Sequence, residues 1–232
     1  PVENSLNVWA PVVNPLRHPL WGRNEEGYSE DPHVTAECAV AYASGLKGDH
    51  PVFWKTVPTL KHLLAYNNER DRCTSSSNLP PRVLHEYDLP PFVEPVAAGV
   101  IGAVMAAYNL VNGRPAHVSR DLYGALREHA PDLVAVSDAY APTNLTEAER
   151  AFATDAEAHA AAIRAGLDSF TDKDADATHT VAAITEALES GALTMDEIRV
   201  AARRLLLMRA ITGELTPQDD PFGDIAADEI DT

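Results

Sequence analysis

The feature of this sequence that most constrains its fold is a repeated alternation of short apolar runs and helical patterns. About five such units follow one another, at intervals of roughly thirty to forty-five residues. A strand followed by a helix, repeated, is the signature of a parallel sheet covered by helices. The expected strands lie at residues 7–13, 55–64, 102–109, 133–136 and 167–170.

Two α/β architectures fit this alternation: an open doubly wound sheet and a (β/α)8 TIM-like barrel. An open nucleotide-binding sheet usually carries a Gly-x-Gly-x-x-Gly turn after its first strand, and none is present here. The phosphate-binding Gly-x-x-x-x-Gly-Lys-Ser/Thr pattern is also missing. The barrel is therefore favoured, and it is expected to be incomplete in this chain because five strands cannot close a barrel of eight.

Local signals indicate where several helices begin and end. Pro32 can open a helix that Gly45 ends, and residues 148–164 form an alanine-rich pattern followed by a terminating Gly166. Pro90 and Pro91 must bend or break a helical pattern that spans residues 79–98. A Thr-x-x-Glu capping box at residues 194–197 opens the last helix.

Composition excludes several classes of partner. The net charge is −17, from 35 acidic and 18 basic side chains, so nucleic acid and anionic membranes would be repelled. No apolar run approaches the roughly 18 residues of a membrane span, and no start resembling a signal peptide is visible, which favours a cytoplasmic over a secreted protein. The two cysteines form neither a disulfide framework nor a metal-binding pattern, and we expect no metal or other cofactor.

Polar side chains follow the expected strands at their carboxyl ends, where barrel enzymes place catalytic groups. Each residue also has an ordinary structural explanation: Asp138 as a cap, Lys61 as a solvated lysine, or Met105 and Tyr108 as core. Their shared position at successive strand ends favours a common site. The candidate residues are Arg23, Lys61, His62, Met105, Tyr108 and Asp138.

An ordered set of motifs resembles the barrel domain of glycoside hydrolase family 3, which includes β-glucosidases, β-xylosidases and β-N-acetylglucosaminidases. The resemblance covers nearly the whole chain, and its specificity comes from the order of motifs that are weak individually. The motifs are the loop 21–32 ending in Glu-Asp-Pro, Lys61-His62 with Asn67-Asn68-Glu69, the Arg-x-Leu-x-Glu-x-x-Leu-Pro-Pro-Phe-like segment 82–92, Met105-x-x-Tyr108-Asn109, Val136-Ser137-Asp138 and Ala165-Gly166-Leu167-Asp168.

The resemblance implies a retaining exo-β-glycosidase acting on terminal β-D-glucosyl or β-D-xylosyl residues of small oligosaccharides or β-glycosides. Asp138 would be the nucleophile that forms a covalent glycosyl-enzyme. Arg23, Lys61 and His62 would bind sugar hydroxyls, with Tyr108 near the nucleophile and Met105 as an apolar wall. The nucleophile must be ionised, so a low pKa of Asp138, supported by nearby cations, is expected.

Departures from the family pattern define what else is expected. The upstream Asp-Gly-Pro segment is missing, so residues 1–215 are interpreted as a barrel domain truncated at its N-terminus, and residues 216–232 as the start of a linker. The acid/base of most members comes from a following α/β domain of the same parent chain. Residues 63–67 lack the His/Asp pair of the N-acetylglucosaminidase branch, and Ala139 stands where many β-glucosidases have tryptophan.

Two other functions fit parts of the pattern. A non-catalytic carbohydrate-binding barrel, or an inactive fragment, would explain the missing acid/base. A barrel lyase could use Lys61 as a Schiff base, although this hypothesis rests on one lysine at a strand end.

Overall fold

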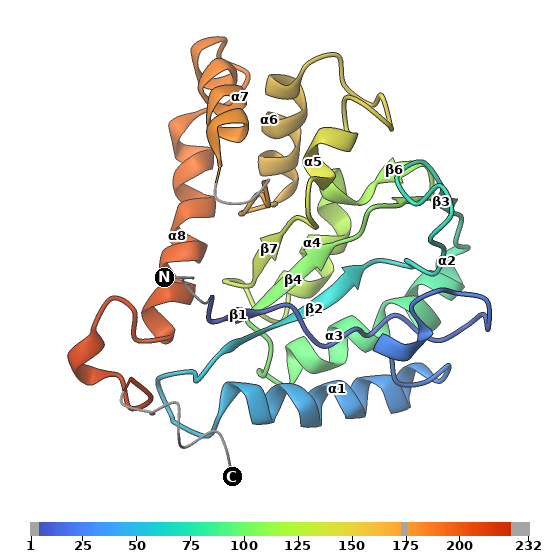
Figure 1. Cartoon of the computed structure of the whole chain (residues 1–232), viewed down its shortest axis with the longest axis vertical. Helices are drawn as coiled ribbons and strands as arrows, with labels where there is room; N and C mark the ends of the chain where they lie inside the picture. The colour runs from blue at the N-terminus through green and yellow to red at the C-terminus, as the bar shows by residue number, and fades with distance from the viewer. Residues whose placement is uncertain (1–4, 173–175, 224–232) are drawn as a thin grey trace.

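The computed structural model describes residues 5–172 and 176–223, and its frame is a parallel sheet with the strand order β1-β2-β4-β7 (Figure 1). All neighbouring strands in this sheet run parallel. A single bridge from Val136 to Ser169 adds the next segment to the edge of β7. The four strands are β1 (Asn7–Val8), β2 (Val57–Leu63), β4 (Ala103–Ala106) and β7 (Val134–Val136).

Helices cover both faces of this sheet, which is why its strands are apolar on both sides. Successive residues of a strand point to opposite faces. Val104 and Ala106 join the core that includes Phe92, whereas Ala103 and Met105 join a separate apolar cluster. The helices are α1 (Pro32–Lys47), α2 (Pro81–Val83), α3 (Pro90–Ala97), α4 (Arg120–Arg127), α5 (Ala141–Asn144), α6 (Asp155–Ala165), α7 (Thr178–Glu189) and α8 (Met195–Ile211).

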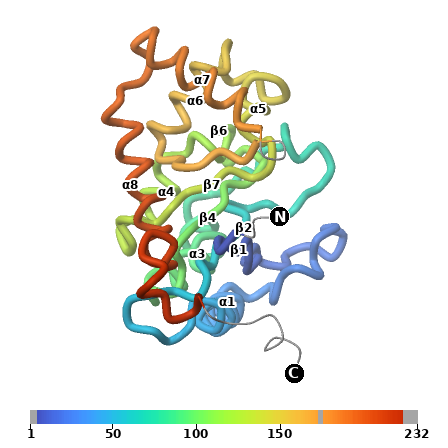
Figure 2. Tube along the Cα trace, turned by 60° about the vertical axis from the view of Figure 1, so that its left-hand side comes forward, coloured from blue at the N-terminus to red at the C-terminus, as the bar shows by residue number. Residues whose placement is uncertain are grey.

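Helix α8 packs on the sheet face opposite the main core, through Leu205, Met208 and Ile211. Figure 2 shows it running along one side of the molecule, beside the stacked strands. A small second sheet and four short helical turns complete the described structure. They are β3 (Ser76–Ser77), β5 (Leu110–Val111) and β6 (Arg114–Pro115), with η1 (Asn24–Glu26), η2 (Leu84–Asp88), η3 (Ala116–Val118) and η4 (Pro217–Asp219).

The predicted α/β class with a parallel sheet is confirmed, and the sheet formed by the described residues does not close. Two helix boundaries were predicted wrongly. The first helix continues through Gly45 to Lys47 and ends at Gly48, whose φ of +78° suits glycine. The helix predicted from residue 148 begins only at Asp155, where the Thr154 side chain caps it.

The expected linker at residues 216–232 is only partly visible, because residues 224–232 lie outside the described structure. Among the described residues, no helix is long and apolar enough to cross a membrane. In the same part of the chain, no three histidine, cysteine or acidic side chains are grouped as a metal ion would require.

A buried carboxylate ties the sheet to two helices. Asp168 accepts hydrogen bonds from Arg127 of α4 (2.6 Å), from Arg204 of α8 (3.0 Å) and from the backbone N–H of Ala135 in β7 (2.9 Å). Its side chain is 1% exposed. Burial raises the pKa of Asp168, and the two arginines oppose that rise. The network therefore fixes the strand that leads to Asp138.

We expect Asp168→Ala to lower the free energy of unfolding by about 3–5 kcal/mol, because it leaves two arginines without their buried partner. The control is Asp132→Ala, which removes an exposed partner of Arg203 and should cost less than about 1 kcal/mol. Urea unfolding measures the free energy of unfolding of both variants. An equal loss of stability in the two would contradict the structural role of Asp168.

Candidate active site

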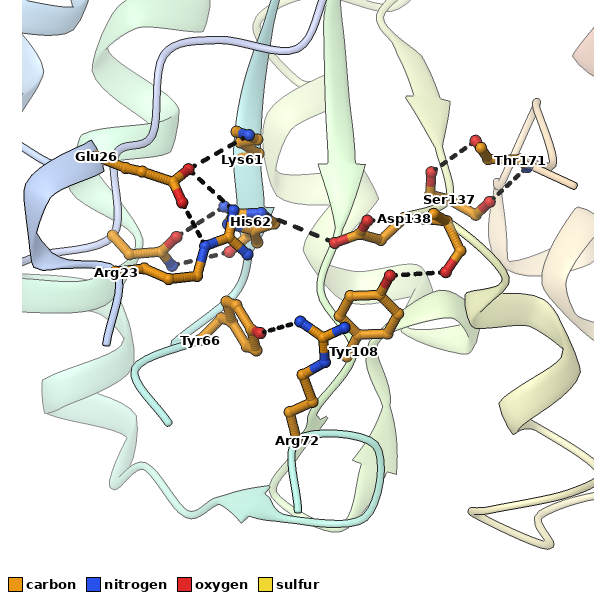
Figure 3. Close-up of polar contacts among 12 residues, drawn as sticks. Arg23, Glu26, Lys61, His62, Tyr66, Arg72, Tyr108, Ser137, Asp138 and Thr171 are labelled. Atoms are coloured by element: carbon orange, nitrogen blue, oxygen red, sulfur yellow. Dashed lines mark hydrogen bonds and ion pairs between the residues drawn. The ribbon is translucent and has the colours of Figure 1, made fainter. Parts of the chain in front are cut away.

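Five of the six predicted site residues meet at the carboxyl ends of the parallel strands (Figure 3). Lys61 and His62 lie near the end of β2, Tyr108 follows β4, and Asp138 follows β7. Arg23 reaches them from the loop that precedes α1, directly before η1. The pairing of β2 with β4 shifts register between Leu60 and Leu63, at the position of the two consecutive site residues.

The two carboxylate oxygens of Asp138 have different environments. Oδ1 accepts a hydrogen bond of 2.7 Å from the backbone N–H of Ala139. Oδ2 is buried without a hydrogen-bond partner among the described residues, and it lies 3.8 Å from Nε2 of His62. One oxygen is thus held in place, while the other keeps its full capacity to accept hydrogen bonds.

Burial is the largest influence on the charge of Asp138. It raises the pKa of this carboxyl, and the backbone hydrogen bond from Ala139 and the charges of Arg23 and Lys61 oppose that rise. The pKa is therefore shifted upward, in the direction opposite to the low value expected from the neighbouring cations alone. The desolvation that the sequence could not show exceeds their effect.

His62 is neutral in this environment. Burial, followed by the charges of Arg23, Lys61 and Arg72, lowers the pKa of His62 to about 2. Its contact with Asp138 is therefore not an ion pair. The ring nitrogen Nδ1 is buried and has no hydrogen-bond partner in the described structure, so the imidazole retains hydrogen-bonding capacity for a ligand.

Glu26 links the two cations of the site. It accepts hydrogen bonds from Nε (2.5 Å) and Nη2 (2.9 Å) of Arg23, and its Oε2 lies 3.5 Å from Nζ of Lys61. The hydrogen bond from Arg23 lowers the pKa of Glu26, which keeps it ionised. The ion pair with Glu26 holds Arg23 within the loop that precedes α1. It leaves Arg23 beside the site, above the ring of Tyr66.

Tyr108 supports the loop that carries Asp138. Its hydroxyl donates a hydrogen bond of 2.7 Å to the carbonyl of Ala139. Burial and the neighbouring Asp138 raise the pKa of the Tyr108 phenol, so it stays protonated. The guanidinium of Arg72 covers its ring, with Cζ 4.3 Å from the ring centroid.

Arg72 and Tyr66 were not predicted as site residues. Arg72 donates a hydrogen bond of 3.2 Å to the Tyr66 hydroxyl, which donates one of 2.8 Å to Glu69. Glu69 also accepts a hydrogen bond from the indole of Trp21. The available signal was an aromatic residue and several charges in the loop directly after Lys61-His62, because such loops concentrate functional residues.

Met105 lies apart from these polar residues. It is 1% exposed and packs with Val57, Val134 and Val136 on the sheet face that contacts α8. In register it pairs with Val136, two residues before Asp138. Its role as an apolar wall of the site stays a prediction.

The arrangement suits attack by a carboxylate on a polar, uncharged ligand. Asp138 supplies a partly desolvated oxygen, and Arg23, Lys61 and Arg72 supply hydrogen-bond donors around it. Neutral His62 can donate or accept, as ligand hydroxyl groups require.

Comparison with known proteins identifies a matching protein family and similar enzymes. Residues 5–208 match the glycosyl hydrolase family 3 N-terminal domain. The chain is 31% identical over 237 residues to an exo-1,4-β-xylosidase of Emericella nidulans, covering 98% of this chain and 30% of that protein. It is 35% identical over 220 residues to a β-glucosidase of Rhizobium radiobacter, covering 91% of this chain and 24% of that protein.

Solved structures show the same likeness. An exo-β-xylosidase of this family, bound to a xylobiose aziridine activity-based probe, superposes with a TM-score of 0.89 at 27% identity. The match covers 97% of this chain and 30% of that one. A β-glucosidase of Listeria innocua in complex with glucose superposes with a TM-score of 0.79 at 26% identity. That match covers 94% of this chain and 30% of the other. The chain thus spans less than a third of the length of these relatives.

We expect Asn14→Ala to destabilise the protein by about 2–4 kcal/mol, because it leaves buried backbone groups of His62 unpaired. The fully buried Asn14 amide donates to the His62 carbonyl (2.9 Å) and accepts from its N–H (2.7 Å). Asn67→Ala is the control, since that amide donates one hydrogen bond, to Pro15. Thermal and urea unfolding measure the stability of both variants. An equally small loss of stability in the two would contradict this role of Asn14.

Proposed function

The chain belongs to glycosyl hydrolase family 3, and from this we propose that it provides the nucleophile of a retaining exo-β-glycosidase. The enzyme would release terminal non-reducing β-D-glucosyl or β-D-xylosyl residues from small oligosaccharides and β-glycosides. The named relatives include both a xylosidase and a glucosidase, which supports a hydrolase of this substrate class.

The observation that carries the proposal is the free Oδ2 of Asp138 among cationic and neutral donors at the strand ends. In a retaining mechanism this oxygen attacks the anomeric carbon, the bond to the leaving oxygen breaks, and a glycosyl ester forms. Water then cleaves the ester and regenerates the carboxylate. Oδ1, fixed by Ala139, keeps the carboxylate oriented for the attack.

The remaining side chains would bind the sugar in the subsite next to the cleaved bond. Lys61, Arg23 and His62 would donate hydrogen bonds to its hydroxyl groups, and Arg72 stacked on Tyr108 would close another side. Retaining chemistry also needs an acid/base about 5–5.5 Å from the nucleophile. We propose that a following α/β domain of the same parent chain supplies it, consistent with relatives more than three times as long.

A 2-deoxy-2-fluoro glycoside with an activated leaving group should label Asp138 of the intact protein, because fluorine slows hydrolysis of the glycosyl ester. Peptide mass spectrometry locates the label.

Asp138→Ala should lower kcat by at least about 10³-fold while the fold is retained. Asp132→Ala, which removes an exposed carboxylate that precedes β7 at the opposite end of the strand, should keep normal activity. Label on a different residue would refute the nucleophile. Sugar binding without label or turnover would favour a non-catalytic module.

Replacement of Lys61 tests the electrostatic part of the proposal. Its charge lowers the pKa of Asp138, so Lys61→Met should raise that pKa further. Because Asp138 must be ionised to attack, the acidic limb of the kcat/KM profile should move to higher pH, by roughly half a unit or more. Lys55→Met, at an exposed lysine, should leave the limb in place. If the acidic limb of the kcat/KM profile of Lys61→Met is unchanged or moves to lower pH, this account is contradicted.

A further inference from the structure

Ser137 is hydrogen-bonded to the segment that follows α6 through three groups: its N–H, its hydroxyl oxygen and its carbonyl. Ser137 directly precedes Asp138 and is 0% exposed. Its N–H donates to the carbonyl of Ser169 at 3.0 Å. Its Oγ accepts from the N–H of Thr171 at 2.8 Å, and its carbonyl accepts from Oγ1 of Thr171 at 3.0 Å (Figure 3).

Thr171 also holds the backbone on the far side of Asp138. Its carbonyl accepts a hydrogen bond of 3.0 Å from the N–H of Tyr140. One residue thus contacts the chain before and after the carboxylate, through its N–H, its carbonyl and its hydroxyl. Tyr140 has a φ of +57°, which a tyrosine rarely adopts, so the local path depends on such external bonds.

The segment that carries Thr171 is itself anchored to two helices. The ring of Phe170 stacks on His159 of α6, with centroids 4.8 Å apart and planes 16° apart. Asp172 accepts a hydrogen bond of 2.7 Å from Thr180 of α7. Contacts of its two neighbours with α6 and α7 therefore hold Thr171 in place. A residue that positions another must itself be held in this way.

We propose that Thr171 is a positioning residue for Asp138, acting through Ser137 on the rate at which the carboxylate attacks. The inference rests on the proposed function. The Asp138 side chain has one hydrogen bond, from the backbone of its own neighbour Ala139, so the direction of Oδ2 follows the backbone at residues 137–140. Loss of the Thr171 hydroxyl removes one of the bonds that fix this path. Displacement of a reacting group by about 1 Å can cost 10²-fold in rate.

The test is the inactivation of the intact protein by the 2-deoxy-2-fluoro glycoside, which isolates the attack step from turnover. Thr171→Val should lower the first-order inactivation rate constant by about 10–100-fold, with little change in the concentration for half-saturation. Thr171→Ser keeps the hydroxyl and should stay within about threefold of the wild type. Thr185→Val is the matched control, because that exposed hydroxyl bonds the carbonyl of Val181 within α7.

A purely structural role gives a different result: a lower melting temperature, with the folded fraction reacting at the normal rate. That result, or equal slowing in Thr171→Val and Thr171→Ser, overturns the inference. Ser137→Ala provides a second variant, since it leaves the N–H of Thr171 unpaired but keeps the hydroxyl bond. A normal rate in folded Ser137→Ala also overturns it. Label of the wild type outside Asp138 refutes the proposed function itself, whereas label on Asp138 with a normal Thr171→Val rate refutes only the positioning role.

Discussion

The parallel pairing of β2, β4 and β7 is the constraint on which the rest of the structure depends. The register aligns Val104 with Ala135 and Met105 with Val136, so the polar residues that follow each strand emerge at one edge. Because side chains alternate along a strand, a slip of one residue would exchange the two faces of β7. It would break both the apolar contact with α8 and the approach of Asp138 to His62. Packing and chemistry are therefore fixed by the same register.

Much of this frame could be predicted from the sequence, because continuous apolar runs such as Leu133–Val136 have few structural alternatives once helices follow them. The helix boundaries were harder. The alanine-rich residues 148–154 satisfy a helical pattern, yet the chain turns back there, with the N–H of Ala151 bonded to the carbonyl of Leu145. The fifth expected strand, residues 167–170, forms one bridge, from Ser169 to Val136. The N–H of Leu167 bonds back to the carbonyl of Ala162 at the end of α6, and the next residue, Thr171, bonds to the loop of Asp138.

Some features of the candidate site could be predicted from the sequence and others could not. Strand-end residues were predictable because parallel strands end together, as Lys61, Tyr108 and Asp138 show. The contacts between loops were not, because nothing in sequence spacing indicates that Arg72 stacks on Tyr108 or that Glu26 joins Arg23 to Lys61. Burial was equally invisible, and it reverses the expected direction of the Asp138 pKa. Long-range packing, rather than local preference, decides these features.

The carboxylate shared by Arg23 and Lys61 has a consequence for charge balance. Arg23, Lys61 and Arg72 face Glu26, Glu69 and Asp138, while His62 is neutral, so the ionised site has no net charge inside a chain of −17. Under the proposed function, such a site would accept an uncharged sugar without favouring anions or cations. Under the proposed mechanism, the glycosyl ester removes the charge of Asp138 and leaves the site with one excess positive charge. An acid/base carboxylate close to it would then be favoured in its ionised form, the state that must activate water in the second step.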